Sequence, residues 1–468
     1  MMIVDTKVQK ERVCTLLHDV VRYARAQNIT AEVWAHGEQS ALVRLANSAV
    51  SLNTREELFE LTVTACRGNA RGSATVMATP DERERLYAAV HQADDIARHA
   101  TPTSYARTFL PIAPLPDDDA GFDPALCQLS SQEMVAYVET AVEGLESAEH
   151  VVAGMCSWGA VWEGTANTLS DEVGWHALTD AGISLVLAHT RQRWELQSTQ
   201  SAARAAQLHP SAVRDELATL LSAYQHAPAS ALPLGRYDIV FGREATAQLL
   251  LVCCWLGFHG GNCRRQRTFL KEQHVGTQVF SPQITVMDDP TQRDTFPYAF
   301  DVHGVPRHPF PLVTRGVFNG FFWDRDSADE FRERETGHSV PALSLTLAPG
   351  QERIASLAAL LALPRERDLL YVPELHYMNV VHETEGIVTC CSRFGALLLR
   401  KEGGVTVPYN VRITEKLGHI FAHVAWLSHE TVTVNVSSTY GRRTPQACVV
   451  PRFTCVEGVE VTHANTSF

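Results

Sequence analysis

The sequence of 468 residues predicts an α+β fold: an N-terminal α/β domain with an antiparallel or mixed sheet and flanking helices, then a C-terminal β-rich domain with one central buried helix. Two observations predict this class. Segments with the 3.6-residue period of amphipathic helices occur together with segments of the two-residue period of half-buried strands. The two kinds of segment do not alternate regularly, as they do in a doubly wound parallel sheet.

The first predicted elements are a helix and a pair of strands. Residues 6–27 place apolar side chains at helical spacing, so we expect an amphipathic helix there. Apolar and polar residues alternate from Phe59 to Ala65, which indicates a half-buried strand. Glycines within the segment Arg67–Gly72 indicate a turn to a second strand. Thr79-Pro80, followed by two acidic residues, predicts a helix that ends near His99.

A second set of elements follows. Ser130 and Glu133 have the spacing of a capping box, which predicts a helix that carries apolar residues as far as Leu145. Strands are expected from about 150 to 197, and a further helix over roughly 210–225. The order helix, strands, helix therefore occurs twice, which suggests an internal repeat.

The chain divides into two predicted domains. Residues 109–124 are rich in Pro and Asp, and we interpret them as a linker between the two copies of the repeat. Residues 226–235 also have the composition of a boundary. The prediction is an N-terminal domain over residues 1–228 and a C-terminal domain over residues 235–468.

The C-terminal domain is predicted to contain mainly short strands separated by turn residues. Examples are Tyr237–Phe241, Val317–Trp323, Ala396–Lys401 and Thr431–Val436. The exceptions are an apolar helix near 243–257, expected to be buried, and a short helix near 326–334.

Composition and charge exclude several classes of protein. The formal net charge of −13 argues against a binder of nucleic-acid phosphates. The longest apolar run, Leu249–Phe258, is too short to span a membrane, and the N-terminal sequence has no apolar stretch of a secretory signal. Eleven cysteines without regular spacing are typical of reduced thiols, so we expect a cytoplasmic protein.

Several segments in the second half occur in the order that is typical of one family. They are Gly260-Gly261-Asn262 with Arg264, Arg265 and Thr268-Phe269-Leu270, then Val286–Pro290, Phe300-Asp301-x-x-Gly304, Arg315–Gly320, Thr336-Gly337-His338, Leu347–Gly350, Leu370-Tyr371-Val372, Asn379 and Thr384-x-Gly386. Through them the chain resembles the TldD/PmbA proteins, also described as modulators of DNA gyrase. The resemblance implies a heterodimeric zinc peptidase that acts on unfolded or flexible peptides.

The chain departs from that family at the site of the chemistry. In the catalytic subunit type, the central helix carries HExxxH, in which two imidazoles bind zinc and the Glu activates water. Here the corresponding positions hold approximately Val252, Cys253 and Gly257, and neither His382-Glu383 nor His429-Glu430 is followed by a second His in reach. The chain therefore resembles the non-catalytic PmbA/TldE subunit, which lacks this motif.

This resemblance implies a division of labour between two chains. We expect no catalytic residue and no cofactor in this chain, zinc in a HExxxH-bearing TldD-like partner, a peptide substrate, and no nucleic acid or membrane. Two alternatives stay open: a stand-alone peptide-binding or scaffold homodimer, and a divergent peptidase with its own Cys/His site.

Other candidate residues follow from chemistry and from the resemblance. Four residues have side chains that can bind a metal ion, although no CxxC pair occurs among them: Cys253, Cys254, His259 and Cys263. Arg264, Arg265 and Arg267 form a basic segment that could bind a peptide carboxylate or a partner's acidic surface, or could be a solvated loop. Further substrate-binding candidates, from the resemblance, are His338, Tyr377, Asn379 and Thr384. Departures from the family pattern are Ser344, where Asn is usual, and Ser437-Ser438, near the place of a Cys in the catalytic subunit.

Overall fold

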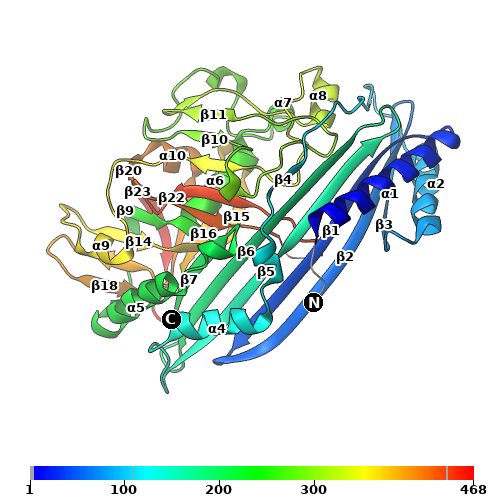
Figure 1. The fold of residues 1–468 in the computed structure, drawn as a ribbon. Coiled ribbons are helices and arrows are strands. Elements are labelled where there is room, and N and C mark those ends of the chain that lie inside the picture. The colour runs from blue at the N-terminus through cyan, green and yellow to red at the C-terminus, as the bar shows by residue number, and fades with distance from the viewer. Residues whose placement is uncertain (1–4, 108, 439–440) are drawn as a thin grey trace.

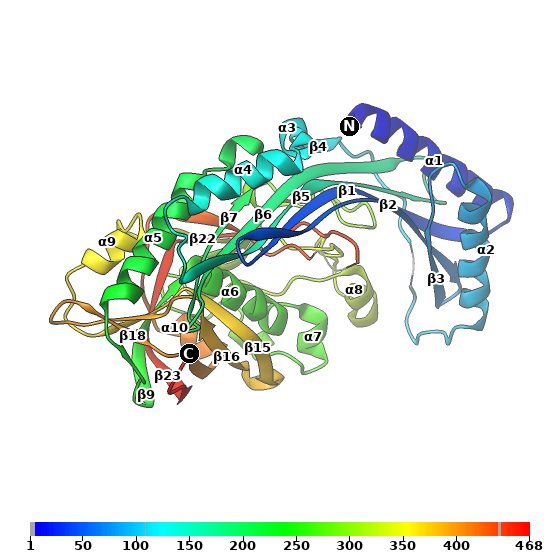
Figure 2. The same cartoon turned by 90° about the horizontal axis from the view of Figure 1, so that it is seen from below.

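The computed structural model describes residues 5–107, 109–438 and 441–468. A long twisted sheet from the first half runs across the molecule, with helices along one of its faces (Figure 1). The second half lies against the opposite face at one end of this sheet, and the other end projects beyond it (Figure 2). Mixed helices and several sheets confirm the predicted α+β class.

The first half contains both copies of the predicted succession of elements. Its elements are α1 (Thr6–Ala26), β1 (Thr30–Ala46), β2 (Ala49–Arg67), β3 (Ala70–Met77), α2 (Arg83–His99), β4 (Asp118–Gly121), α3 (Pro124–Gln128), α4 (Ser131–Val142), β5 (His150–Asn167), β6 (Val173–His189), β7 (Glu195–Ala202) and α5 (Pro210–His226).

The strands of both copies form one sheet. The order is β3-β2-β1-β5-β6, and β4 and β7 both pair with the far edge of β6. Strands β1 and β5 are antiparallel neighbours at the centre, from Glu32 opposite Asn167 to Leu45 opposite Gly154. Each copy therefore contributes two long strands and one shorter strand to a continuous sheet.

The helices bury one face of this sheet. Helices α1 and α2 cover one end, with Leu16, Leu17 and Val20 buried on the apolar face of α1. Helices α4 and α5 cover the other end, where Trp158 and Leu185 are fully buried with them. The opposite face of the sheet is called here the inner face, because the second half of the chain packs against part of it.

Three details differ from the sequence-based expectations. Helix α2 begins at Arg83, not at Thr79, because the Glu82 carboxylate accepts a hydrogen bond from the Thr79 N–H (2.6 Å) and closes a turn before the helix. Helix α4 has the predicted capping box but ends at Val142. Residues 109–124 are packed against the sheet, since they include strand β4 and the buried side chain of Ile112.

The second half is rich in short strands, as predicted. Its elements are β8 (Ala229–Ser230), β9 (Gly235–Gly242), α6 (Arg243–Gly257), α7 (Gly260–Arg264), β10 (Val286–Asp288), β11 (Phe310–Thr314), β12 (Val317–Phe318), α8 (Arg325–Phe331), β13 (Leu345–Leu347), α9 (Leu357–Ala362), β14 (Leu369–Val372), β15 (Glu374–His382), β16 (Ile387–Arg393), β17 (Leu397–Leu399), β18 (Val405–Pro408), β19 (Val411–Lys416), α10 (Leu417–Ala422), β20 (Val424–Leu427), β21 (Thr431–Asn435), β22 (Ala447–Pro451) and β23 (Phe453–Ala464).

These strands form a six-stranded and a ten-stranded sheet. The central helix α6 contacts strands of both, and its residues Leu249, Leu250 and Cys253 lie in their common core, as expected for a buried helix. The strands expected over Val317–Trp323 and Ala396–Lys401 are shorter than predicted. Among the described residues, every helix is too short or too polar to cross a membrane.

Candidate functional site

A row of alternating acids and imidazoles crosses the inner face of the long sheet. The row consists of Glu60, His36, Glu163, His176 and Asp118, one residue on each of β2, β1, β5, β6 and β4. Each residue is the direct cross-strand partner of the next. Side chains opposite each other on one face lie about 5 Å apart at their Cβ atoms, so the charges of neighbouring strands interact.

Both histidines of this row are buried and bonded to a carboxylate. The Nδ1 of His36 lies 3.0 Å from Glu163 Oε1, and the Nδ1 of His176 lies 2.7 Å from Asp118 Oδ2. Burial disfavours the charged form of His36, but its hydrogen bond to Glu163 and the nearby Glu38 carboxylate (3.9 Å from Nε2) outweigh burial and raise its pKa above the usual value. The row therefore carries titratable charge inside the protein.

A loop from the second half is bound to this face through two arginines. The Arg443 guanidinium donates to both Asp180 carboxylate oxygens (2.6 and 2.9 Å) and to Ser157 Oγ (2.8 Å). The Arg443 backbone N–H donates to Glu38 Oε2 (2.7 Å). Next to it, Arg442 donates to Glu60 Oε1 (3.0 Å), and its guanidinium lies 4.3 Å from the centre of the Trp34 ring. Because Arg443 and Asp180 are almost fully buried, this pair fixes the loop on the sheet.

Two hollows of about 180 and 130 Å³ adjoin each other around Arg443. Together they form what we call the inner groove, which crosses β2, β1, β5, β6 and β7 towards the start of α6. Its polar and charged lining is Glu38, Ser40, Arg44, Thr54, Glu56, Ser157, Asp180, Ser184, Thr199, Gln200, Ser201, Glu244, Asn435, Ser437 and Arg443. These groups offer many hydrogen-bond donors and acceptors, as a main-chain ligand requires.

Sequence reasoning missed most of the inner groove. Of its residues, only Ser437 attracted notice, as a departure from the family pattern, and its hydroxyl lies 3.3 Å from an Asp180 oxygen. One signal was present. Glu32, His36 and Glu38 recur at even positions of a strand, which marks a polar face on β1. This alternation predicts which face of β1 is polar. It does not predict that the loop around Arg443 lies against that face.

The HExxxH positions of the central helix do not provide a zinc site here. Cys253 is buried in the apolar core, and a side chain at Gly257 would meet the Phe269 ring at 2.9 Å. Among the described residues, no group of three or more His, Cys, Asp or Glu side chains is arranged to bind a metal ion. Burial alone raises the pKa of Cys253, which keeps this thiol neutral.

The other predicted metal ligands are committed to the fold. His259 caps α7, since its Nδ1 accepts a hydrogen bond from Asn262 N–H (3.2 Å). Its Nε2 lies 3.0 Å from Asp324 Oδ2, so both ring nitrogens have partners. The Cys263 thiol faces the Leu270 carbonyl (3.8 Å), and Cys254 is buried with Cys253 in the core. The four side chains are therefore not brought to one centre.

Three arginines at the end of α7 and just after it are at the surface, and each is paired with an acid. Arg264 lies 2.7 Å from Glu333 and 2.9 Å from Glu272, Arg265 pairs with Glu330, and Arg267 lies 3.2 Å from Glu383. An incoming carboxylate would have to displace these partners.

His338 lies in the interior. Its Nδ1–H donates to the Thr336 carbonyl (2.7 Å), and its Nε2 lies 3.0 Å from Asp288 Oδ2. Arg307 pairs with the same carboxylate. Burial opposes ionisation of Asp288, but the contacts with His338 and Arg307 hold its pKa at about 2. The histidine is thus part of a buried charged cluster.

Tyr377, Asn379 and Thr384 lie along the free edge of the ten-stranded sheet. Strand β15 is the terminal strand of that sheet and carries Tyr377 and Asn379, and Thr384 follows it. Tyr377 has a positive φ of 52° within a bulge and is 70% exposed. Of the sequence-predicted residues, these three are the ones placed together at an accessible backbone edge.

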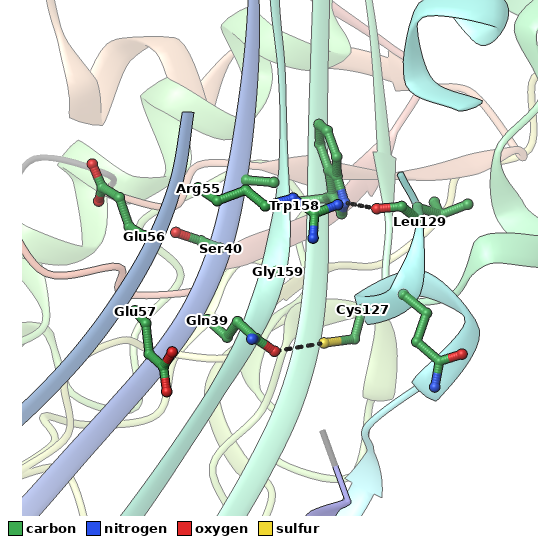
Figure 3. Close-up of a pocket in the computed structure, with 11 residues that line it drawn as sticks. Gln39, Ser40, Arg55, Glu56, Glu57, Cys127, Leu129, Trp158 and Gly159 are labelled. Carbon is green, nitrogen blue, oxygen red and sulfur yellow. Dashed lines mark hydrogen bonds between the residues drawn. The ribbon is translucent and has the colours of Figure 1, made fainter. Parts of the chain in front are cut away.

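A further cavity of about 370 Å³ lies near α3, on the helix-covered side of the sheet (Figure 3). Figure 3 shows Cys127 facing Gln39, with Sγ and Oε1 3.9 Å apart, and Trp158 donating to the Leu129 carbonyl (3.0 Å). Burial raises the pKa of Cys127 to about 11, so its thiol is not ionised at neutral pH. This cavity offers no activated nucleophile.

Comparisons with known proteins agree with this architecture. Residues 234–463 match the family model of the PmbA/TldA metallopeptidase C-terminal domain. The chain is similar over 96% of its length to the whole of TldE from Thermococcus kodakarensis, with 17% identity and a TM-score of 0.77. Similar structures also include proposed modulators of DNA gyrase from Thermotoga maritima (14% identity, 96% of this chain and 99% of that chain, TM-score 0.75) and Bacteroides thetaiotaomicron (15% identity, 98% and 99%, TM-score 0.73). No curated protein sequence matches the chain.

These matches define a protein with the fold of the metallopeptidase-like gyrase modulators. Residues 234–463 belong to the C-terminal domain of the TldD/PmbA family, as the sequence motifs of that half predict.

Proposed function

We propose that this chain is the non-catalytic subunit of a heterodimeric zinc peptidase of the TldD/TldE type. The observation that carries the proposal is the central helix α6, whose HExxxH positions hold an apolar residue, a buried thiol and a glycine packed against Phe269. A zinc ion needs several His, Cys or carboxylate ligands and a water activated by a base. These positions supply one such side chain, the Cys253 thiol, which is buried in the apolar core, and they supply no base. In this proposal the zinc and the chemistry belong to a HExxxH-bearing partner.

The contribution of this chain would be to hold a flexible peptide. The inner groove supports this role, because it offers polar side chains across five strands and includes the buried Arg443. At its outer end, Arg44 and Glu56 are exposed and face the groove. The free edge of β15 also supports a peptide-holding role, since an extended peptide can add to a sheet edge through main-chain hydrogen bonds. Both features recognise backbone more than a particular side chain.

The contact with the partner is proposed to include the exposed apolar side chains of α6 and β15. Trp255 is 58% exposed on α6, Val381 is 57% exposed on β15, and the two elements pack together. Large exposed apolar side chains and free sheet edges are both typical of interaction surfaces. The eleven free thiols, seven of them buried, support a reducing compartment, and we propose the cytoplasm.

Co-purification with a HExxxH-bearing relative tests the proposal. We expect a stable complex with one zinc per heterodimer, and zinc should be lost when the partner's HExxxH is mutated. Absence of association at micromolar concentrations, or zinc-dependent hydrolysis by this chain alone, would contradict the proposal. A homodimer that stays homodimeric when the relative is added would support the scaffold alternative instead.

A matched pair of variants tests the contact surface. Val381→Lys on β15 should weaken the complex, because it places a charge in the proposed contact. Val8→Lys on α1 is the control, since Val8 is also 57% exposed but lies on the helix-covered side of the molecule. Equal retention of partner by both variants would exclude this surface.

A further inference from the structure

We propose that His419 on α10 and His423, the residue that follows the helix at its C-terminus, form a surface site for a borderline divalent transition-metal ion such as Zn²⁺, Ni²⁺ or Cu²⁺. This site is separate from the HExxxH positions of α6. It uses two imidazoles, and water would complete the coordination, so it needs no third protein ligand.

The helix places the two rings on one face. The backbone N–H of His423 donates to the His419 carbonyl (3.0 Å), so a full helical turn separates the residues. Residues at positions i and i+4 lie above one another on a helix, and two histidines at this spacing chelate one metal ion. The ring centroids are 3.9 Å apart with an interplanar angle of 30°, which shows that the side chains already lie together.

The hydrogen bonds of both rings leave one nitrogen available on each. The Nδ1 of His423 lies 2.9 Å from the His419 carbonyl, and the Nε2 of His419 lies 3.1 Å from the Gly458 carbonyl. A carbonyl accepts, so these nitrogens carry the protons and the opposite nitrogens hold lone pairs. Metal-binding histidines usually donate their second N–H to a carbonyl or carboxylate in this way, which fixes the tautomer and the ring orientation.

The local charge favours a cation overall. Glu415 Oε2 lies 3.9 Å from His419 Nε2, and Glu457 is beside His423 through its backbone N–H (3.0 Å). Arg236 also approaches His419 (3.5 Å), but this arginine is paired with Glu415 (3.2 Å) and Glu460 (3.7 Å). Since the Glu457 carboxylate lies 3.8 Å from Arg367, three carboxylates and two arginines lie around this site. The His419 side chain is 25% exposed and His423 is exposed, so hydrated ions have access.

Metal titration of the isolated, untagged chain tests the site. Calorimetry with Ni²⁺, Cu²⁺ and Zn²⁺ at neutral pH should show one equivalent of each ion, with Cu²⁺ bound most tightly. His423→Gln should lower the affinity about tenfold or more, since the chelating pair becomes a single imidazole.

The double variant His419→Gln/His423→Gln tests whether these two histidines are the metal ligands. This variant should no longer bind the one equivalent of metal ion. The control variant His382→Gln/His463→Gln, which removes two other exposed histidines, should still bind it. Unfolding temperatures of both variants without metal check that the fold is intact. The proposal would be overturned if His419→Gln/His423→Gln bound metal ions as well as the wild type does. It would also be overturned if the wild type bound them only at millimolar concentrations. The inference is independent of the heterodimer, because the first variant should still bind the partner and its HExxxH-dependent zinc.

Discussion

Arg443 is the residue on which the inner groove depends most directly. Its guanidinium neutralises Asp180, and its backbone N–H and side chain also bind Glu38 and Ser157. These contacts join residues from β6, β1 and β5 to a loop of the second half. A buried ion pair of this kind adds little stability compared with apolar packing, but removal of one partner leaves an uncompensated charge.

Arg443→Met is therefore expected to destabilise the chain by about 3–5 kcal/mol. The neighbouring Arg442→Met should cost about 1 kcal/mol or less, because Arg442 is 30% exposed and its ion pair is solvated. Urea unfolding of both variants measures the difference. Similar losses for the two arginines would show that the Arg443–Asp180 pair is not the point of attachment.

His36 makes stability depend on pH. Its pKa is raised in the folded chain, so the folded state holds the proton more tightly than the unfolded state. The resulting stabilisation is complete below the unfolded pKa, about 6.5, and is lost as pH rises through the higher folded pKa. The free-energy difference between the wild type and His36→Gln should therefore shrink as the pH rises above about 6.5 and through the raised pKa of the folded state. A difference that grows over this range would contradict the role of the carboxylates around His36.

At the scale of elements, local signals predicted the structure well where the chain itself provides the contacts. The capping box at Ser130 is complete, with Glu133 N–H donating to Ser130 Oγ (3.2 Å) and Ser130 N–H donating to Glu133 Oε2 (2.8 Å). Helices α1, α5 and α6 also lie where their periodicity predicts them. Short strands such as β12 and β17 were less predictable, since their ends are set by partners distant in sequence.

Loss of this capping box should measurably weaken α4. Ser130→Ala is expected to cost about 1 kcal/mol of unfolding free energy, because it removes the acceptor of a helix N–H. Gln132→Ala, an exposed position in the same turn, should change stability by about 0.5 kcal/mol or less. Equal effects in a thermal unfolding comparison would mean that the cap does not contribute.

The inner groove could not be predicted at either of these scales. The groove forms only when β1, β5 and β6 pair in register and Arg443 lies against them. Arg443 is 263 residues beyond its partner Asp180 in the sequence. Periodicity gives the polar face of β1 but carries no information on the loop that lies against it. Similarly, the sequence shows that His338 and His259 have side chains suited to a functional site. Only the structure shows that their ring nitrogens form hydrogen bonds within the protein.

The two halves of the chain share an apolar core. One apolar core includes Trp158 and Leu217 from the first half together with Tyr371 and Phe453 from the second. Neither half can expose this core to water without a large loss of buried apolar area. Calorimetry should therefore give a single unfolding transition whose van't Hoff and calorimetric enthalpies agree. Two resolved transitions would show that the halves unfold independently.

The long sheet also indicates how such a chain could arise. Its centre is the antiparallel pair of β1 and β5, each copy adds two strands outward, and each has helices on the same face. An antiparallel pair is the one arrangement in which two identical strands can be related by a two-fold axis. A protein half as long as this sheet-forming region could thus have built the same sheet as a symmetric dimer. Gene duplication and fusion would then have freed each copy to diverge, so that a single face came to carry Glu163 and Asp180 from one copy and His36 from the other.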